Sequence, residues 1–447
     1  DLKARLANLG QVSDLGLDVA SFTDKFIRGT LDADIRFTQF NDTDRRLDIQ
    51  ADITDAEISA PAFGWSKKPG VPGTARITVD FAGETIRDIP GFSITAADLK
   101  ISGRAGYGAR GKGLQRIDFE RISFGHTEIK GAVIAHENGG WDAEFRGPSF
   151  DMTSLWEDIL QGDNSGGDSF TLPYLTLAVE LERVWIGPNR LLNNISGTFA
   201  HEDETWKTVL LKGEIGDAKS FELTIRSGPD GNRNLLMTAS DAGEALRVTD
   251  LYDSMQGGRL EIAGQYAEST PDQPLIGKIR IKGYRITRAP ALAHVLSIMA
   301  LTGIIEALEG DGLAFSTLDI PFVLGPGWMK IKNARAFGTS LGFTASGTVY
   351  TYADVVDING TVIPAYAINS ALGHIPVLGE IFTSGEKGGG VFAANYTMSG
   401  STDDPKVTVN PLSALTPGFF RNIFNIFGQA DFTPQADDDP RQPQEIR

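Results

Sequence analysis

The stretch Leu175-Thr176-Leu177-Ala178-Val179-Glu180-Leu181-Glu182 decides the fold, because an apolar residue occupies every second position in it. A strand places alternate side chains on opposite faces, so this pattern predicts a strand that is buried on one face only. The same alternation recurs in three further segments: Phe221–Ile225, Ile279–Ile281 and Ile117–Phe119. The chain is therefore predicted to be mainly β.

Short turn signals separate many of the predicted strands. They are Pro229-Asp230-Gly231, Asn138-Gly139-Gly140, Asn359-Gly360 and Gly257-Gly258. Short strands joined by short turns favour antiparallel neighbours that follow one another in sequence order.

A second local pattern is an apolar residue, then a small or polar residue, then glycine. It occurs at Ile101–Gly103, Ile129–Gly131, Ile195–Gly197, Ile262–Gly264, Ala345–Gly347 and Met398–Gly400. We expect this pattern at strand ends. Its irregular spacing argues against a strict solenoid repeat.

Helical patterns are few. Thr153–Leu160 is predicted as a short helix capped by Asp151 or Thr153, and Glu244–Met255 as an amphipathic helix. Ala291–Leu308 is apolar nearly all round, but His294 and Glu306 lie within it. A helix buried against the sheet is therefore favoured over a membrane span.

The C-terminal part carries two further helical signals and a polar tail. Ala365–Phe382 contains Pro376 and predicts two short helical pieces at most. Pro417–Phe427 predicts a short apolar helix, and the acidic, proline-containing residues 429–447 are predicted to be disordered.

Composition excludes several classes of function. The chain of 447 residues has a net charge of −17, whereas nucleic-acid binding requires clustered Lys and Arg, so no nucleic-acid partner is expected. Cysteine is absent, which excludes disulfides and thiolate sites. No signal peptide starts at Asp1, so we expect a longer parent protein with its membrane segment upstream.

No motif makes a positive case for catalysis. Gly106–Lys112 has the spacing of a nucleotide-binding loop, but Gly113 stands where a magnesium-binding Ser or Thr is required, so a hairpin loop is expected. The histidines show no metal-ligand spacing; they are His126, His136, His201, His294 and His374. We predict a protein that is not an enzyme and has no cofactor or metal site.

From about Asp241 onward the sequence resembles the AsmA-like C-terminal region of the large bacterial envelope proteins of the YhdP and TamB type. The segments that carry the resemblance are Leu251–Leu260 (LYDSMQGGRL), Ala289–Leu292 (APAL), Leu301–Ile304 (LTGI), Asn333–Gly338 (NARAFG), Thr361–Asn369 (TVIPAYAIN) and Ser399–Ser413 (SGSTDDPKVTVNPLS). The residues before Asp241 resemble this family only in general composition: they are rich in predicted strands and in turn glycines, and they contain no signature motif.

This resemblance implies a bridge-like lipid transfer protein of the periplasm, anchored in the inner membrane, that moves phospholipid between the inner and outer membranes. It implies three parts: an antiparallel β-groove segment (1–240), an AsmA-like module with a few short helices (241–428) and the tail (429–447). The fold expected from pattern and resemblance together is an elongated, highly curved antiparallel sheet that forms an apolar groove.

A strand of five or six residues spans about 17 to 20 Å, close to the length of an extended acyl chain, so an apolar sheet face can shelter lipid tails. The residues expected to line the groove are Leu175, Leu177, Val179, Leu181, Phe221, Leu223 and Ile225. A one-residue slip in register would exchange the faces. The alternative from periodicity alone is that these faces pack on one another as a β-sandwich core.

Two further interpretations remain open. The protein could instead be an assembly scaffold for outer-membrane proteins that binds client strands through open sheet edges. The C-terminal helix could contact a membrane or an envelope partner protein, or pack over the end of the sheet; its contact residues would be Phe419, Phe420, Ile423, Phe424 and Phe427.

Overall fold

The computed structural model describes residues 2–6, 27–108, 113–136, 139–161, 174–203, 205–298, 302–364, 394–402 and 404–410. The chain divides into two compact units. The first comprises residues 1–158 and 167–214, and the second comprises residues 159–166 and 215–447.

Strands make up most of the first unit. Their bounds are β1 (Leu2–Leu6), β2 (Ile27–Arg28), β3 (Leu31–Gln39), β4 (Asp44–Asp52), β5 (Glu57–Ala60), β6 (Trp65–Lys67), β7 (Gly73–Ala82), β8 (Thr85–Ala96), β9 (Leu99–Tyr107), β10 (Leu114–Phe124), β11 (Thr127–Ala135), β12 (Trp141–Asp151), β13 (Leu175–Gly187), β14 (Arg190–Glu202) and β15 (Thr205–Ile215). A 3-10 turn, η2 (Pro61–Phe63), and a helix, α2 (Thr153–Gln161), complete this stretch of chain.

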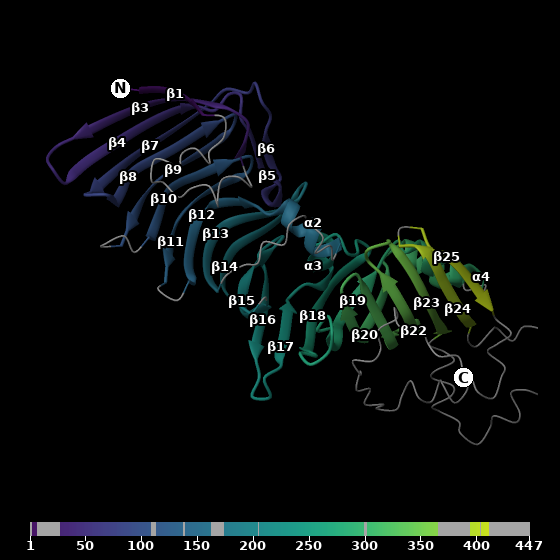
Figure 1. Cartoon of the computed structure of the whole chain (residues 1–447). Coiled ribbons are helices and arrows are strands. Elements are labelled where there is room, and N and C mark those ends of the chain that lie inside the picture. The colour runs from purple at the N-terminus through teal and green to yellow at the C-terminus, as the bar shows by residue number, and fades with distance from the viewer. Residues whose placement is uncertain are drawn as a thin grey trace, which may run out of the picture. The chain divides into compact units, whose positions relative to one another are not determined.

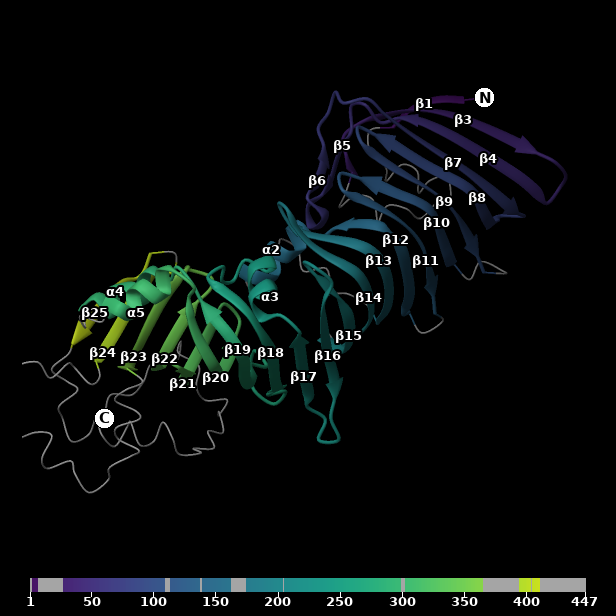
Figure 2. The ribbon, with the colours of Figure 1, turned by 180° about the vertical axis from the view of Figure 1, so that it is seen from behind.

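The strands of the first unit lie side by side in one curved sheet (Figures 1 and 2). From β3 through β4, β7, β8, β9, β10, β11 and β12 each strand is antiparallel to the next, and β1 pairs with the free edge of β3. β13 then pairs with β12 in parallel, and β14 with β13 antiparallel. The parallel pair reflects its connection, since a parallel neighbour requires a crossover rather than a hairpin and α2 lies between the two strands.

A small sheet covers one end of the large one. β5 pairs with β2 and with β6, and Ile58 and Trp65 from this sheet join a buried cluster with Ala96 and Leu99 of the large sheet. This cluster is an apolar core of the described part of the first unit.

The second unit repeats the single-layer arrangement. Its strands β16 (Lys219–Ser227), β17 (Arg233–Ala239), β18 (Met255–Tyr266), β19 (Leu275–Ile286), β20 (Leu313–Gly325), β21 (Trp328–Gly338), β22 (Leu341–Tyr350), β23 (Val355–Pro364), β24 (Ala394–Ser401) and β25 (Lys406–Asn410) pair in sequence order, all antiparallel. Its helices are α3 (Ala242–Val248), α4 (Pro290–Ile298) and α5 (Thr302–Glu309).

The predicted fold class is confirmed: the protein is mainly β, with long curved antiparallel sheet and a few short helices. The sandwich interpretation is not confirmed, because within each unit the described strands of the long sheet form one layer, and the small sheet of β2, β5 and β6 packs over only one end of it. The hairpin predicted between Tyr107 and Leu114 is also confirmed, since β9 and β10 are antiparallel and Gly108 N donates to Gly113 O (2.9 Å).

The helix predictions have mixed outcomes. The helix at Thr153 forms, and Asp151 Oδ1 accepts the Thr153 amide (3.0 Å) as a capping group should. The prediction for Glu244–Met255 is wrong in extent, because Asp241 caps the helix earlier and Asp250 takes a positive φ of 64° just after Thr249. Met255 begins β18 instead.

The apolar segment Ala291–Leu308 forms two helices, α4 and α5, in place of one. Val295, Leu296 and Leu308 are buried, and α4 contacts β25, on the side of the sheet seen in Figure 2. Within the part of the chain that the structure describes, every helix lacks the length and apolarity needed to span a bilayer. The predictions for 365–382, 417–427 and 429–447 lie outside the described residues.

Two predicted turns are wrong. Asn359-Gly360 lies inside β23, where a Cβ at position 360 would lie 2.6 Å from the Tyr396 hydroxyl, so this glycine makes room for a neighbouring strand. Gly257-Gly258 lies inside β18, where both residues have positive φ (65° and 87°) and form a local irregularity in the strand.

Ion pairs organise the polar face of the first unit. Arg46 of β4 donates from Nε to Asp80 Oδ1 (2.6 Å) and from Nη2 to Oδ2 (2.8 Å), and Arg87 Nη2 donates to the same Oδ2 (3.3 Å). The Asp80 side chain is only 8% exposed. The hydrogen bond and charge of Arg46, with the charge of Arg87, hold the pKa of Asp80 below its usual value.

We predict that Asp80→Asn lowers the free energy of unfolding by about 1 to 3 kcal/mol near neutral pH, because hydrogen bonds to a charged group are lost. A depressed carboxyl pKa stabilises the folded state above the ordinary value of 3.8 and loses that effect as the pH falls through the folded pKa. Urea denaturation over a pH series should therefore show that the free energies of unfolding of the wild-type protein and Asp80→Asn become equal as the pH falls. Asp42→Asn, at an exposed turn position, is the control. If the free energies of unfolding of the wild-type protein and Asp80→Asn differ by the same amount at neutral and acidic pH, the charge of Asp80 is not what stabilises the fold.

Candidate functional site

The large sheet of the first unit has one apolar and one polar face. On β13 the side chains of Leu175, Leu177, Val179 and Leu181 share a face, and Thr176, Ala178 and Glu180 point the other way. Paired residues on neighbouring strands lie on the same face, so the registers extend this division from strand to strand. The apolar face is the candidate functional surface.

A row of phenylalanine and glycine residues crosses this face from strand to strand. It is formed by Phe92, Gly103, Phe119, Gly131, Phe145, Val179 and Gly197, each paired with the next. We call it the phenylalanine–glycine row. Its rings contact one another across the intervening glycines: Phe92 and Phe119 have centroids 6.0 Å apart, and Phe119 and Phe145 have centroids 6.2 Å apart.

The glycines of the row leave the space that the rings occupy. A Cβ on Gly103 would lie 2.8 Å from Cζ of Phe92, and one on Gly131 would lie 2.5 Å from Cδ1 of Phe145. Real Cβ atoms do not approach other atoms so closely, so a larger residue at either position must displace both the ring and the still closer backbone carbonyl of Asp118 or Glu144. The glycines therefore give the aromatic rings room beside the neighbouring strands, where the planes of Phe92 and Phe119 meet edge to face at 83° and those of Phe119 and Phe145 are tilted by 35°.

This finding corrects the expectation for the apolar–x–glycine pattern. Gly103, Gly131 and Gly197 lie within β9, β11 and β14, not at their ends. The pattern places its apolar residue and its glycine two positions apart, and hence on the same face. It is the sequence signal of the apolar face, and it could have located the row if read together with the phenylalanines of adjacent strands.

Four of the seven predicted lining residues belong to this face of the first unit. Val179 is in the phenylalanine–glycine row, Leu177 pairs with Ala143 and Phe199, and Leu181 pairs with Gly147 and Ile195. Leu175 pairs with Trp141 and His201 at the end of the strand. Leu181 is buried, whereas Leu175, Leu177 and Val179 are half-buried.

Partial exposure is the notable property of β10 to β14. The apolar side chains at the centre of these strands remain half-buried; they include Ile117, Phe119, Val133, Phe145, Leu177, Val179 and Phe199. No strand of the described part of this unit is stacked over them as a second sheet. Solvent, or an apolar guest, reaches this part of the face.

The other three predicted lining residues lie on β16 of the second unit. Phe221 pairs with Ala239, Leu223 with Met237 and Ile225 with Leu235. The middle pair continues into a row of half-buried residues: Leu223, Met237, Ile262, Ile279 and Ile320. Phe221 and Ile225 are buried, so Leu223 is the member of this group that reaches solvent.

The predicted C-terminal contact residues lie outside the described part of the chain. These are Phe419, Phe420, Ile423, Phe424 and Phe427.

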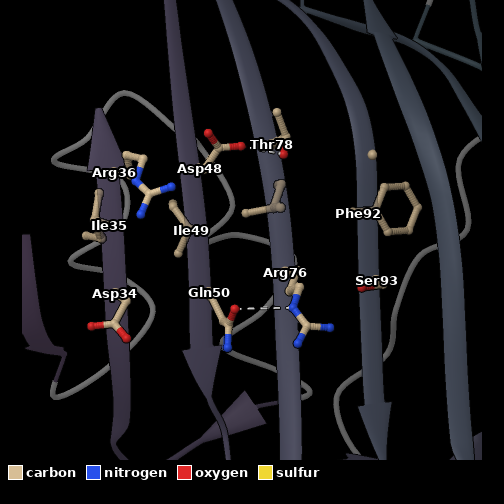
Figure 3. Close-up of a pocket in the computed structure, with 12 residues that line it drawn as sticks. Asp34, Ile35, Arg36, Asp48, Ile49, Gln50, Arg76, Thr78, Phe92 and Ser93 are labelled. Atoms are coloured by element: carbon tan, nitrogen blue, oxygen red, sulfur yellow. Dashed lines mark hydrogen bonds between the residues drawn. The ribbon is translucent and has the colours of Figure 1, made fainter. Parts of the chain in front are cut away.

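A hollow of about 620 Å³ lies over the middle of β3, β4, β7 and β8 (Figure 3). Its lining includes Asp34, Arg36, Asp48, Gln50, Arg76, Thr78 and Ser93. These residues alternate with Ile35, Ile49, Ile77 and Phe92, so the hollow opens on the polar face. Thr78 donates to Asp48 (2.8 Å) and Arg76 to Gln50 (3.3 Å), so its polar groups largely satisfy one another.

The described residues contain no group of three His, Asp or Glu side chains placed to hold a metal ion. His126 stacks on Trp185 with centroids 4.3 Å apart, His136 Nε2 lies 2.8 Å from Asp142 Oδ2, and buried His201 packs against Trp206. His294 is exposed, and His374 lies outside the described residues.

Comparisons with protein-family models, with curated proteins and with solved structures give no match to this chain.

We predict that Gly131→Ala destabilises the first unit by about 1 to 3 kcal/mol, because the new methyl group overlaps the Phe145 ring and the Glu144 carbonyl. Gly106→Ala is the matched control, since a Cβ there meets no atom within 4 Å. Thermal unfolding of the two variants measures the difference. Equal midpoints would show that the rings do not depend on the glycine.

Proposed function

We propose that this protein is a lipid-binding protein of the bridge-like type, which shelters phospholipid acyl chains on the apolar faces of its sheets. The observation that carries the proposal is the half-buried apolar surface of β10 to β14, which lies on a single-layer sheet. An ordinary core would bury such side chains fully, whereas a surface for exchangeable apolar guests leaves them accessible.

The dimensions of the surface support this proposal. β13 carries apolar side chains on this face from Leu175 to Leu181, and at about 3.3 Å per residue this run spans about 23 Å, which is close to the length of one extended acyl chain. Each methylene removed from water contributes about 0.8 kcal/mol, so a single chain laid along a strand gains several kcal/mol without a polar contact.

The phenylalanine–glycine row supports the same substrate class. Phenylalanine rings and glycines offer many van der Waals contacts and no side-chain hydrogen-bonding groups. Such a surface suits flexible hydrocarbon chains of differing length more than a rigid ligand that needs fixed polar contacts.

The cellular setting is proposed from the AsmA-like resemblance. In this proposal the chain is part of a periplasmic protein whose parent is anchored in the inner membrane, and the lipid is phospholipid in transit between the inner and outer membranes. The assembly-scaffold alternative has weaker support, because the edge strand β25 has five residues and α4 contacts it.

We predict that Leu177→Arg reduces the phospholipid that co-purifies with the protein, and its transfer between vesicles, by at least about tenfold, because a charge on the surface must be desolvated by bound chains. Leu177→Ala should have little effect, since many equivalent contacts remain. Quantitative lipid extraction and a fluorescent transfer assay measure both.

The matched control is Ala178→Arg. Ala178 is the next residue along β13, faces the polar side and pairs with Glu144, so the new arginine meets a carboxylate there. If folded Leu177→Arg protein retains normal lipid and transfer, the apolar face is not the lipid-binding surface.

A further inference from the structure

Arg45 is a cation on the apolar face of the first unit. It lies two residues before Leu47 in β4, so both side chains project from the same side of the sheet. Leu47 belongs to the buried apolar cluster of this unit. Arg45 pairs with Gln39 of β3 and with Phe81 of β7.

This arginine stands at the strand end where apolar side chains reach solvent. Phe37 is 56% exposed, and the turn that joins β3 to β4 forms one corner of the sheet in Figure 1. Phe37 pairs with Leu47 and is therefore a diagonal neighbour of Arg45 on the same face. At the other strand end, Ile58 and Trp65 of the small sheet are buried in the core.

The guanidinium group of Arg45 lacks a partner among the described residues. Its Nε is fully buried and has no hydrogen-bond acceptor there. By contrast, Arg46, Arg104 and Arg116 on the polar face each donate to a carboxylate. A guanidinium cannot lose its proton, so this buried N–H without an acceptor is unfavourable. Arg45 as a whole is only half-buried, and its two terminal nitrogens are the groups that a ligand can reach.

The chemistry of the surroundings identifies that ligand. A phosphate group offers oxygens that a guanidinium binds in a bidentate manner. Phe37 and Phe81 are the apolar neighbours that the attached chains would contact. Because the chain as a whole carries a net charge of −17, general attraction of free anions is disfavoured, and the apolar part of the ligand must supply much of the affinity.

Building on the proposed function, we infer that Arg45 binds the phosphate of a phospholipid whose acyl chains contact Phe37 and Phe81. This end of the apolar face then receives the lipid headgroup, and the arginine selects phospholipids over apolar lipids that carry the same chains.

The test uses the full chain incubated with phosphatidylcholine vesicles that contain equal amounts of dioleoylphosphatidylglycerol and dioleoylglycerol, followed by quantification of both lipids on the re-isolated protein. We expect the wild-type protein to favour the phospholipid and Arg45→Gln to lower that preference by about tenfold, the effect of losing a charge-assisted hydrogen bond. Total bound lipid should fall less, because acyl contacts remain.

Arg76→Gln is the matched control, since it removes the same charge from the polar face, where Arg76 bonds only to exposed Gln50 among the residues described. Arg45→Lys keeps the charge but loses the bidentate geometry, and should be intermediate. It also serves as the test variant if Arg45→Gln does not fold.

An unchanged preference in folded Arg45→Gln or Arg45→Lys protein overturns the inference and leaves the proposed function intact. Displacement of the phospholipid by excess inorganic phosphate would also overturn it, because the site would then bind an anion without its chains. A wild-type protein that takes up none of the three lipids, phosphatidylcholine included, would instead refute the proposed function itself.

Discussion

The structure depends on one constraint: a period of two, sustained along strand after strand, in sheets that have a single layer. Alternation sends the apolar side chains of each strand to one face, and cross-strand register keeps them there. An apolar face in water is unfavourable by about 25 cal/mol for each Å² exposed, so it must be covered by protein or by a guest. Among the described residues of the first unit, β2, β5 and β6 cover one end of the sheet and leave the face of β10 to β14 half-exposed.

The glycines determine how the side chains pack on the apolar face of β8 to β12. Side chains of neighbouring strands compete for space on one face of a sheet, and a strand glycine relieves that crowding. Here the relief is systematic, because Gly103 and Gly131 alternate with Phe92, Phe119 and Phe145 across five strands. The rings lie over the glycines and bridge from strand to strand. The outcome is an apolar surface formed by rings and glycines, while the opposite face carries ion pairs such as Arg46–Asp80.

Much of this organisation was predictable from sequence, and the errors have a common cause. Alternation in Leu175–Leu181 identified both the strand and the residues that share its apolar face, because period two is a local property. Gly360 and Gly257 were predicted to form turns, since glycine in isolation signals a turn. Only the neighbouring strands reveal that Gly360 makes room for Tyr396 and that Gly257 forms an irregularity within β18. The phenylalanine–glycine row was missed for the same reason. Its members come from different strands, and the sequence of one strand does not specify which residues of the next strand it pairs with. The parallel pairing of β12 with β13 likewise depends on the course of the connection between them.

The central claim is that the apolar faces hold lipid, and mass spectrometry of organic extracts from the purified, folded protein tests it most directly. The account predicts phospholipid in at least equimolar amount with the chain, with a spread of acyl lengths, because the surface makes no length-specific polar contact. Protein that is folded and yields no lipid, even after incubation with phospholipid vesicles, would contradict it.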